Sequence, residues 1–284
     1  MSGKLFIIGT PIGNLADISP RTIDALKTCD LILAEDTRIS IKILNHLNLK
    51  KRMLSCHKFN EHERLRLLED ANAQSQNIGL ISDAGMPLIS DPGHPIVECA
   101  IAIGMTVIPI AGPSAFVLAL VGSGLPLDRF SFEGFLPDKA GEINARVQAM
   151  AKDPRTSVYY VSPHKAERTL EVFLAHYGTR KACLVRELTK MHEEFIRGDL
   201  ATILTHIQGS EVRGECVLVV AGCSDVAEDM SDWLSQPAKK EKVLAYIDTA
   251  LKSGVKLSRA AAEGAKEFSI SRSDIYREAL DRQP

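Results

Sequence analysis

The sequence has few of the residues that build metal centres, disulfide scaffolds or aromatic-rich surfaces. It holds six cysteines and one tryptophan in 284 residues, and aromatic residues make up only 5%. No two cysteines have the C-x-x-C spacing of a zinc or redox site, and several lie inside apolar runs such as Cys216–Val220. We therefore expect the cysteines to be small core residues in a reducing compartment, and we expect no metal ion.

Charged residues are absent from one long stretch. No Asp, Glu, Lys, Arg or His occurs from Cys99 to Leu127, which is long enough for a membrane-spanning helix. Glycines and prolines interrupt this stretch repeatedly, so a strand, a turn and a short buried helix explain it better. The apolar run near the N-terminus is too short for a signal peptide. These features predict a soluble, cytoplasmic protein without a membrane partner.

A strong net charge is also lacking. The whole chain carries −2, so nucleic-acid binding would depend on local basic patches. The charge is unevenly distributed, because residues 238–284 carry ten basic and seven acidic side chains. A segment with four acids and no base, residues 225–237, precedes this basic tail and is predicted to be a linker.

Short apolar runs alternate with amphipathic segments in the first third of the chain, and this order predicts an α/β domain with a mainly parallel sheet. The predicted strands are residues 5–8, 31–34, 53–56, 78–81 and 106–110, and the predicted helices are residues 20–27, 40–47, 61–74 and 95–103.

A second series of alternating strands and helices follows, and the tail is predicted to contain helices only. The second set has predicted strands at 129–133, 157–161, 182–186, 193–197 and 216–221, with helices opening at Ser162-Pro163 and spanning 200–207. The tail has helical patterns at 242–252, 259–268 and 272–280, the last capped by Ser271. The predicted organisation is a first domain at 1–116, a second at 117–224, the acidic linker at 225–237 and a helical module at 238–284.

Small or acidic turns follow four of the five strands predicted in the first domain. In an open α/β sheet, ligands bind beyond the carboxyl ends of the strands. The glycines allow close backbone approach to a ligand, and Asp83 supplies a carboxylate suited to a cationic or hydroxyl-rich one. Each turn alone is equally compatible with tight turns and capping clusters, but their coincidence predicts one shared ligand crevice. The turns are Gly9–Asn14, Ala34–Arg38, Ser82–Gly93 and Gly112–Ala115.

Seven motifs, taken together and in this order, resemble the ribosomal RNA small subunit methyltransferase I family, a branch of the tetrapyrrole methylase superfamily. The resemblance covers about residues 4–222, with a similar helical tail. The motifs are Thr10–Asn14, Glu35–Arg38, Ser82–Gly85, Ser90–Gly93, Gly112–Ala115, Phe132–Pro137 and Arg186–Lys190.

The resemblance implies two α/β domains, the second with a mixed sheet, and S-adenosylmethionine bound in the cleft between them. It also implies a homodimer and 2′-O-methylation of a cytidine in the decoding region of 16S rRNA, with the rRNA contained in the small ribosomal subunit. By position, the cofactor-binding residues would be Pro11, Ile12, Gly13, Asp83, Gly85, Met86, Pro87, Ser114 and Ala115.

This sequence departs from the family pattern at two positions. Met86 stands where the family usually has threonine, and Val161 stands where it usually has glutamate. A backbone contact at Met86 would survive the change, whereas a contact through a side-chain hydroxyl would not.

A ribose hydroxyl becomes a good nucleophile only when its proton is removed, so a general base is expected. The candidates are Asp36, His57 and Glu187, and the sequence does not choose among them. The candidate RNA-binding residues are Arg38, Lys58, Asn60, Arg186 and Lys190, together with Arg64, Arg66 and the basic tail. The alternatives are a methyltransferase for a tetrapyrrole ring, a non-catalytic RNA-binding protein, and a tail that serves packing or dimerisation.

Overall fold

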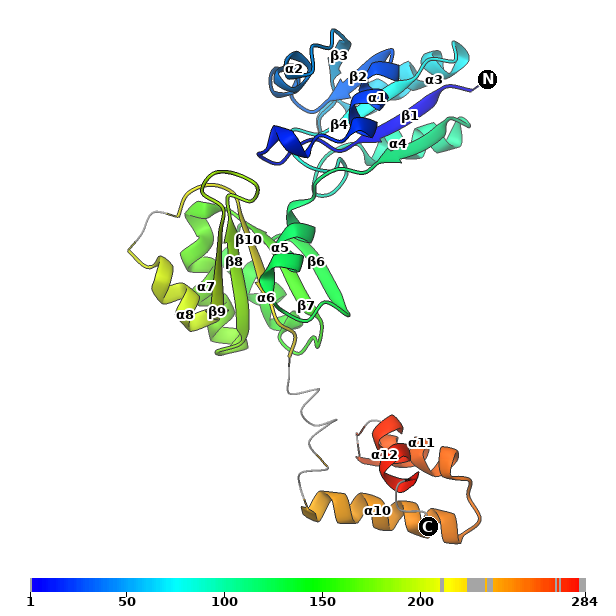
Figure 1. Cartoon of the computed structure of the whole chain (residues 1–284), viewed down its shortest axis with the longest axis vertical. Coiled ribbons are helices and arrows are strands. Elements are labelled where there is room, and N and C mark those ends of the chain that lie inside the picture. Colours follow the sequence, from blue (N-terminus) through cyan, green and yellow to red (C-terminus); the bar gives the residue numbers. More distant parts are fainter. Residues whose placement is uncertain are drawn as a thin grey trace.

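The computed structural model describes residues 2–209, 212–223, 233, 237–268, 270 and 272–280. Within these ranges the chain forms three bodies that follow one another in sequence (Figure 1). The predicted acidic linker lies outside the described residues except for residues 233 and 237, and so does the predicted cap Ser271.

The first body contains a fully parallel five-stranded sheet in the order β3-β2-β4-β1-β5. The three inner strands β2, β4 and β1 are buried apolar runs apart from Lys4, as expected for a parallel sheet covered by helices on both faces, whereas the edge strands β3 and β5 are only partly buried. The predicted parallel sheet is confirmed. The strands are β1 (Lys4–Ile8), β2 (Leu31–Ala34), β3 (Arg52–Ser55), β4 (Ile78–Ile81) and β5 (Thr106–Ile110).

Two helices cover each face of this sheet. Helices α1 (Pro20–Thr28) and α2 (Thr37–His46) pack on the face to which Phe6 points, and α3 (Leu65–Ala73) and α4 (His94–Ala102) pack on the face of Leu5. Helix α2 begins three residues earlier than predicted, because the Asp36 side chain accepts a hydrogen bond from the Arg38 amide and caps it.

The second body contains a mixed five-stranded sheet in the order β6-β7-β10-β8-β9. Only β6 and β7 pair in parallel, and the other neighbours are antiparallel, so the expected mixed sheet is confirmed. The strands are β6 (Phe130–Phe135), β7 (Thr156–Val161), β8 (Lys181–Arg186), β9 (Glu194–Asp199) and β10 (Cys216–Val220).

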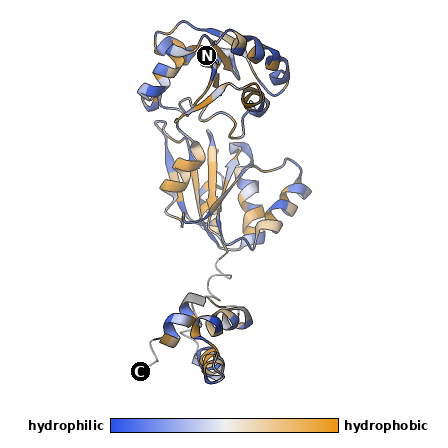
Figure 2. Ribbon diagram, turned by 90° about the vertical axis from the view of Figure 1, so that its right-hand side faces the viewer, coloured by the Kyte–Doolittle hydropathy of each residue, from blue (hydrophilic) through white to orange (hydrophobic). Residues whose placement is uncertain are grey.

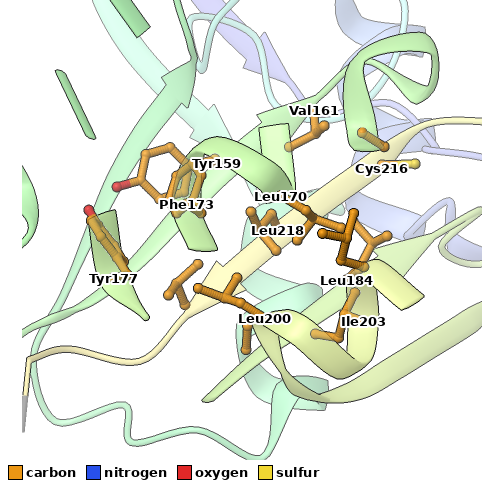
Figure 3. Packing of buried hydrophobic residues seen from close by; sticks show 14 of the residues in the cluster. Tyr159, Val161, Leu170, Phe173, Tyr177, Leu184, Leu200, Ile203, Cys216 and Leu218 are labelled. Atoms are coloured by element: carbon orange, nitrogen blue, oxygen red, sulfur yellow. The ribbon is translucent and has the colours of Figure 1, made fainter. Parts of the chain in front are cut away.

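Three helices, α6 (Ala140–Met150), α7 (Ala166–Tyr177) and α8 (Leu200–Ile207), cover one face of the second sheet. Figure 3 shows the core beneath them, where Tyr159, Phe173 and Tyr177 meet edge to face. The sequence pattern did not predict α6, which buries only Ile143 and Val147. In Figure 2 the apolar strands of this sheet run through the middle of the body.

Helix α5 (Ala115–Ser123) covers the other face of the second sheet. Its buried residues Ala119 and Leu120 pack against Val158 and Val217 of that sheet. The whole of α5 therefore packs with the second body, and the chain passes from one body to the other between β5 and α5. The predicted division after residue 116 falls inside this helix.

The third body is a three-helix module with its own core. It comprises α10 (Pro237–Lys252), α11 (Leu257–Phe268) and α12 (Arg272–Leu280), so the three helices predicted in the tail are present. Fully buried Trp233, Val243 and Ile247 anchor its core. None of the described helices combines the length and the apolar character that a membrane crossing requires.

Candidate functional site

A cavity of about 350 Å³ lies between the first two bodies, within the size range of small-molecule sites. The carboxyl ends of β1, β2, β4 and β5 supply one wall, and β6, β7 and β10 supply the other. The first wall consists of Ile12, Glu35, Asp83, Ala84, Gly85, Met86, Ile89, Ser90, Asp91, Ser114 and Ala115. The second consists of Phe135, Tyr160, Val161, Ser162, Pro163, Glu215, Cys216 and Val217.

The turns after β2 and β4 hold each other in place. The Asp36 amide donates to Asp83 Oδ1 at 3.0 Å, and the Asp83 amide donates to Glu35 Oε2 at 3.4 Å. Two backbone donors that no helix or sheet satisfies are thus paired with carboxylates from the neighbouring turn. This exchange fixes the position of both acids at the cavity wall.

The turns after β1 and β4 are joined in the same way. Thr10 and Gly85 exchange two backbone hydrogen bonds of 2.8 and 3.1 Å, and the buried Thr10 hydroxyl donates to the Ser82 carbonyl at 3.1 Å. Gly85 has φ +83°, a conformation that favours glycine. The predicted ligand turns are therefore a hydrogen-bonded unit.

The ends of β1 and β5 approach so closely that only glycine fits. A Cβ on Gly9 would lie 2.7 Å from the Gly112 Cα, and a Cβ on Gly112 would lie 2.6 Å from the Gly9 Cα. A Cβ on Gly9 would also meet Met86 Sδ at 2.6 Å. Met86 is therefore packed over the glycine pair while it lines the cavity.

One end of the cavity is acidic. Burial is the main cause that raises the pKa values of Glu35, Asp83 and Asp91, and Asp91 is raised to about 6. The nearby Glu35 and Asp83 carboxylates raise the pKa of Asp91 further, whereas a hydrogen bond with Ser82 lowers it. A cationic or hydroxyl-bearing ligand group would relieve this crowding of like charges.

The second wall is mostly apolar and aromatic. The Tyr160 ring packs edge to face on Phe132 at 5.0 Å between centroids and against Phe135 at 5.3 Å. Burial raises the pKa of the Tyr160 hydroxyl, so Tyr160 is neutral at physiological pH, and Glu215 is the one acid of this wall. Phe135 is 63% exposed and offers an aromatic face at the cavity. The cavity therefore joins an acidic end to a surface suited to a flat, weakly polar ring.

Six of the nine residues predicted to bind a cofactor line the cavity: Ile12, Asp83, Gly85, Met86, Ser114 and Ala115. Pro11, Gly13 and Pro87 are not among its lining residues. Gly13 lies instead beneath Lys190 of the second body, since a Cβ at Gly13 would meet Lys190 Cγ at 2.5 Å. Met86 and Val161, where the chain departs from the family pattern, both line the cavity.

No residue of the second wall was among the predicted cofactor-binding residues. Phe135 and Tyr160 belong to strands whose apolar pattern is equally typical of core, and Glu215 precedes β10 in a loop without a distinctive motif. The available signals were Ser162-Pro163, a polar turn directly after β7, the Phe132–Pro137 motif that contains Phe135, and the departure from the family pattern at Val161. Ser90 and Asp91 lie in a turn that the sequence singled out, although no role was predicted for them.

None of the three candidate bases is among the residues that line the cavity. Each instead makes hydrogen bonds with neighbouring residues. The Arg38 side chain donates three hydrogen bonds to the Asp36 carboxylate and lowers its pKa to about 2. Lys190 donates to Glu187 at 2.9 Å and lowers its pKa. His57 Nδ1 accepts from the Phe59 amide at 3.3 Å, so in the neutral ring Nε2 carries the proton.

Most of the predicted RNA-binding side chains have partners within the protein. Arg186 pairs with Glu194 at 2.5 Å, and Lys190 also approaches Glu215 at 3.4 Å. Asn60 uses its side-chain oxygen to accept from the His57 amide at 2.7 Å and its nitrogen to donate to Ser55. Lys58 lies exposed in the same loop. Across the described residues no cluster of three or more His, Cys, Asp or Glu is arranged to hold a metal ion.

Known proteins resemble this chain in both sequence and fold. The family model for tetrapyrrole (corrin/porphyrin) methylases matches residues 4–204. Proteins named ribosomal RNA small subunit methyltransferase I are 38% identical in Pseudomonas aeruginosa and 38% identical in Escherichia coli O157:H7. Both alignments cover 99% of this chain, with 98% and 96% of the respective relatives.

Two solved structures share the fold at low sequence identity. Uroporphyrin-III-C-methyltransferase from Thermus thermophilus has a TM-score of 0.53 at 16% identity, over 78% of this chain and 93% of its own. Diphthine synthase has a TM-score of 0.58 at 17% identity, over 78% and 90% of the two chains. The full-length sequence relationship is much closer than either structural one, and it shows that the chain is a methyltransferase belonging to the ribosomal RNA small subunit methyltransferase I family of the tetrapyrrole methylases.

Proposed function

We propose that this enzyme transfers a methyl group from S-adenosylmethionine to the ribose 2′-oxygen of a cytidine in the decoding region of 16S rRNA. The observation that carries the proposal is the cavity between the two α/β bodies, acidic at one end and apolar on the opposite wall. The relatives named small subunit rRNA methyltransferases, which align over nearly the whole chain, support the acceptor.

The cavity residues fit the proposed cofactor. Asp83, with Glu35 beside it, suits the cofactor's cationic groups and ribose hydroxyls. The aromatic and aliphatic groups of Phe135, Tyr160 and Val217 suit an adenine ring. When bound, the cofactor supplies an activated methyl group, and the protein contributes its alignment with the acceptor oxygen.

We assign removal of the acceptor proton to Asp91 rather than to Asp36, His57 or Glu187. Asp91 lines the cavity, and its pKa of about 6 is close to the pH at which the enzyme must work. Asp36 and Glu187 are held as weak bases by Arg38 and Lys190, and His57 presents a donor rather than an acceptor.

The RNA would reach the cavity along the basic loop at Lys58 and through the C-terminal module, whose sequence carries a net charge of +3. This acceptor places the enzyme in the cytoplasm. Deleting residues 238–284 should weaken rRNA binding and leave cofactor affinity unchanged. Equal rRNA affinity with and without the module would instead indicate a role in packing or dimerisation.

One assay distinguishes the possible acceptors. The protein is incubated with methyl-labelled S-adenosylmethionine and small ribosomal subunits, naked 16S rRNA or a tetrapyrrole, and the label is then located. Label on one cytidine ribose is the expected result. Label on the tetrapyrrole would replace the proposed acceptor, and RNA binding without any label would indicate a non-catalytic protein.

We also propose that the enzyme is a homodimer, in which a second copy covers the apolar surface of α5 and the start of β6. Val117, Val121 and Phe130 are 43%, 68% and 45% exposed there, and β6 is an edge strand of its sheet. Val121→Asp should convert the dimer to a monomer in analytical ultracentrifugation. A monomeric wild-type protein at micromolar concentration would contradict the proposal.

A further inference from the structure

The loop after β3 presents an aromatic ring to solvent. Phe59 is 91% exposed, and its ring contacts only His57 among the described aromatic residues, at 6.1 Å between centroids. A phenylalanine left in water contributes almost nothing to the hydrophobic core. Its position therefore has no explanation in the stability of the fold.

The backbone that carries Phe59 is firmly held. The Asn60 side chain accepts from the His57 amide and donates to Ser55, and Arg64 Nε donates to the Ser55 carbonyl at 2.8 Å. The Phe59 amide itself donates to His57 Nδ1. An exposed ring on such a loop is preorganised for a partner, because little conformational entropy remains to be lost on binding.

This loop adjoins the acidic end of the cavity. Ser55, at the end of β3, pairs in register with Ala34, the residue before the cavity residue Glu35. Glu61 accepts from the Gly93 amide at 2.8 Å and so ties the loop to the turn that carries Asp91. Burial raises the pKa of Glu35, and His57 is close enough to oppose a part of that rise. The loop that carries Phe59 therefore adjoins the part of the cavity where the acceptor would react.

The surroundings of the ring indicate which partner it fits. Lys58 is exposed directly before Phe59, and the exposed Arg66 follows on the same segment. Of the acids between them, Glu61 is engaged with a backbone amide and Glu63 is exposed. A cation adjacent to an exposed aromatic ring is typical of surfaces that bind single-stranded nucleic acid, in which bases stack on the ring and phosphates meet the cations.

We propose that Phe59 is a stacking platform for an unpaired RNA base next to the methylated nucleotide. The proposal rests on the proposed function, because it requires an RNA acceptor. Stacking is tolerant of base identity, so Phe59 would position the strand while other groups select the nucleotide.

The test compares Phe59→Ala, Phe59→Leu and Phe59→Trp with Ile101→Ala. Ile101 is a matched control, since it is 63% exposed on α4 and does not line the cavity. Loss of the aromatic ring should raise KM for the RNA substrate about tenfold in both the Ala and Leu variants. Phe59→Trp and Ile101→Ala should retain the wild-type KM, and cofactor affinity should be the same in all four.

Direct RNA binding separates this proposal from the proposed function. In Phe59→Trp, the new indole should lose fluorescence when 16S rRNA is added, whereas the natural Trp233 is fully buried in the C-terminal module. An unquenched indole, or a wild-type KM in Phe59→Ala with normal methylation, would overturn the proposal and leave the function intact. A wild-type KM in Phe59→Leu alone would indicate a general apolar contact, such as a protein partner, and would also overturn stacking. Quenching without methylation of any RNA would reject the proposed function, and with it the position of Phe59 beside a methylated nucleotide, and would leave only an RNA-stacking contact.

Discussion

The first two bodies contribute to one cavity by different structural means. The N-terminal sheet is parallel, so the carboxyl ends of its strands meet at one edge, and short polar turns there hold one another through Glu35, Asp83 and Thr10. The second sheet is mixed, and it contributes side chains of strands and a loop rather than a set of turns. One half of the site is thus fixed by hydrogen bonds between turns, and the other by side-chain packing.

The largest effect is expected where the N-terminal half depends on backbone contact. Gly112→Ala should lower the free energy of unfolding by about 3 kcal/mol, because the new methyl would overlap the Gly9 backbone, which cannot rotate away. Gly141→Ala is the control, since a Cβ there meets nothing within 4 Å and lies in α6. It should be neutral or stabilising by up to about 1 kcal/mol. Urea denaturation measures the free energy of unfolding of both variants. Equal changes in that free energy would show that the close contact at Gly112 does not exclude a side chain.

The next effect concerns the acids of the same half. Asp91→Asn should reduce the single-turnover rate of methyl transfer, at saturating cofactor, by about 100-fold or more. Asp36→Asn should change the rate less than threefold (~0.6 kcal/mol of barrier), because its carboxylate is committed to Arg38. A large loss in Asp36→Asn with a normal rate in Asp91→Asn would reverse the assignment of the base.

A smaller effect is expected from the packed half. Phe135→Ala should raise the Kd for S-adenosylmethionine about fivefold, which corresponds to ~1 kcal/mol of lost apolar contact. Phe130→Ala, on the same strand but outside the cavity, should leave the Kd unchanged. Isothermal titration calorimetry measures both values. An unaltered Kd in Phe135→Ala would mean that the second wall contributes little to cofactor binding.

The smallest effect is a pH dependence of stability. Asp91 is protonated up to pH 6 or so in the native state, but its ordinary pKa is 3.8. Between these values the native protein binds more protons than the unfolded chain, so stability falls as pH rises from about 4 to 6. Asp91→Asn should remove part of this fall, as measured by urea midpoints at pH 4.5 and 7. If the difference in urea midpoint between Asp91→Asn and the wild type is the same at both pH values, the raised pKa of Asp91 is contradicted.

The same contrast explains what the sequence was able to predict. The strands at 31–34, 78–81 and 106–110 were predicted to the residue, because each is an apolar run between turn residues. The acidic turns were predicted correctly because the carboxyl ends of parallel strands meet at one edge of the sheet, and this does not depend on the helices that connect them. Helix α6 was not predicted, because its two buried residues produce only a weak helical periodicity of apolar residues.

The second wall was out of reach for a different reason. Phe135, Tyr160 and Val217 come together only because β7 pairs with both β6 and β10, across more than fifty residues of chain. In a mixed sheet neither the strand order nor the register follows from local patterning alone. Likewise, the partners of Asp36, Glu187 and His57 depend on side-chain geometry that spacing along the chain does not specify.

The contact between Gly9 and Gly112 also limits how this chain can change by substitution. A side chain at either position collides with main-chain atoms of the other, and main chain is common to all twenty amino acids. No second substitution at the facing position can therefore restore the fit, unlike a core pair in which one residue shrinks as its neighbour grows. No substitution at one glycine can compensate for a substitution at the other. A side chain at either position requires the two backbone segments to move apart.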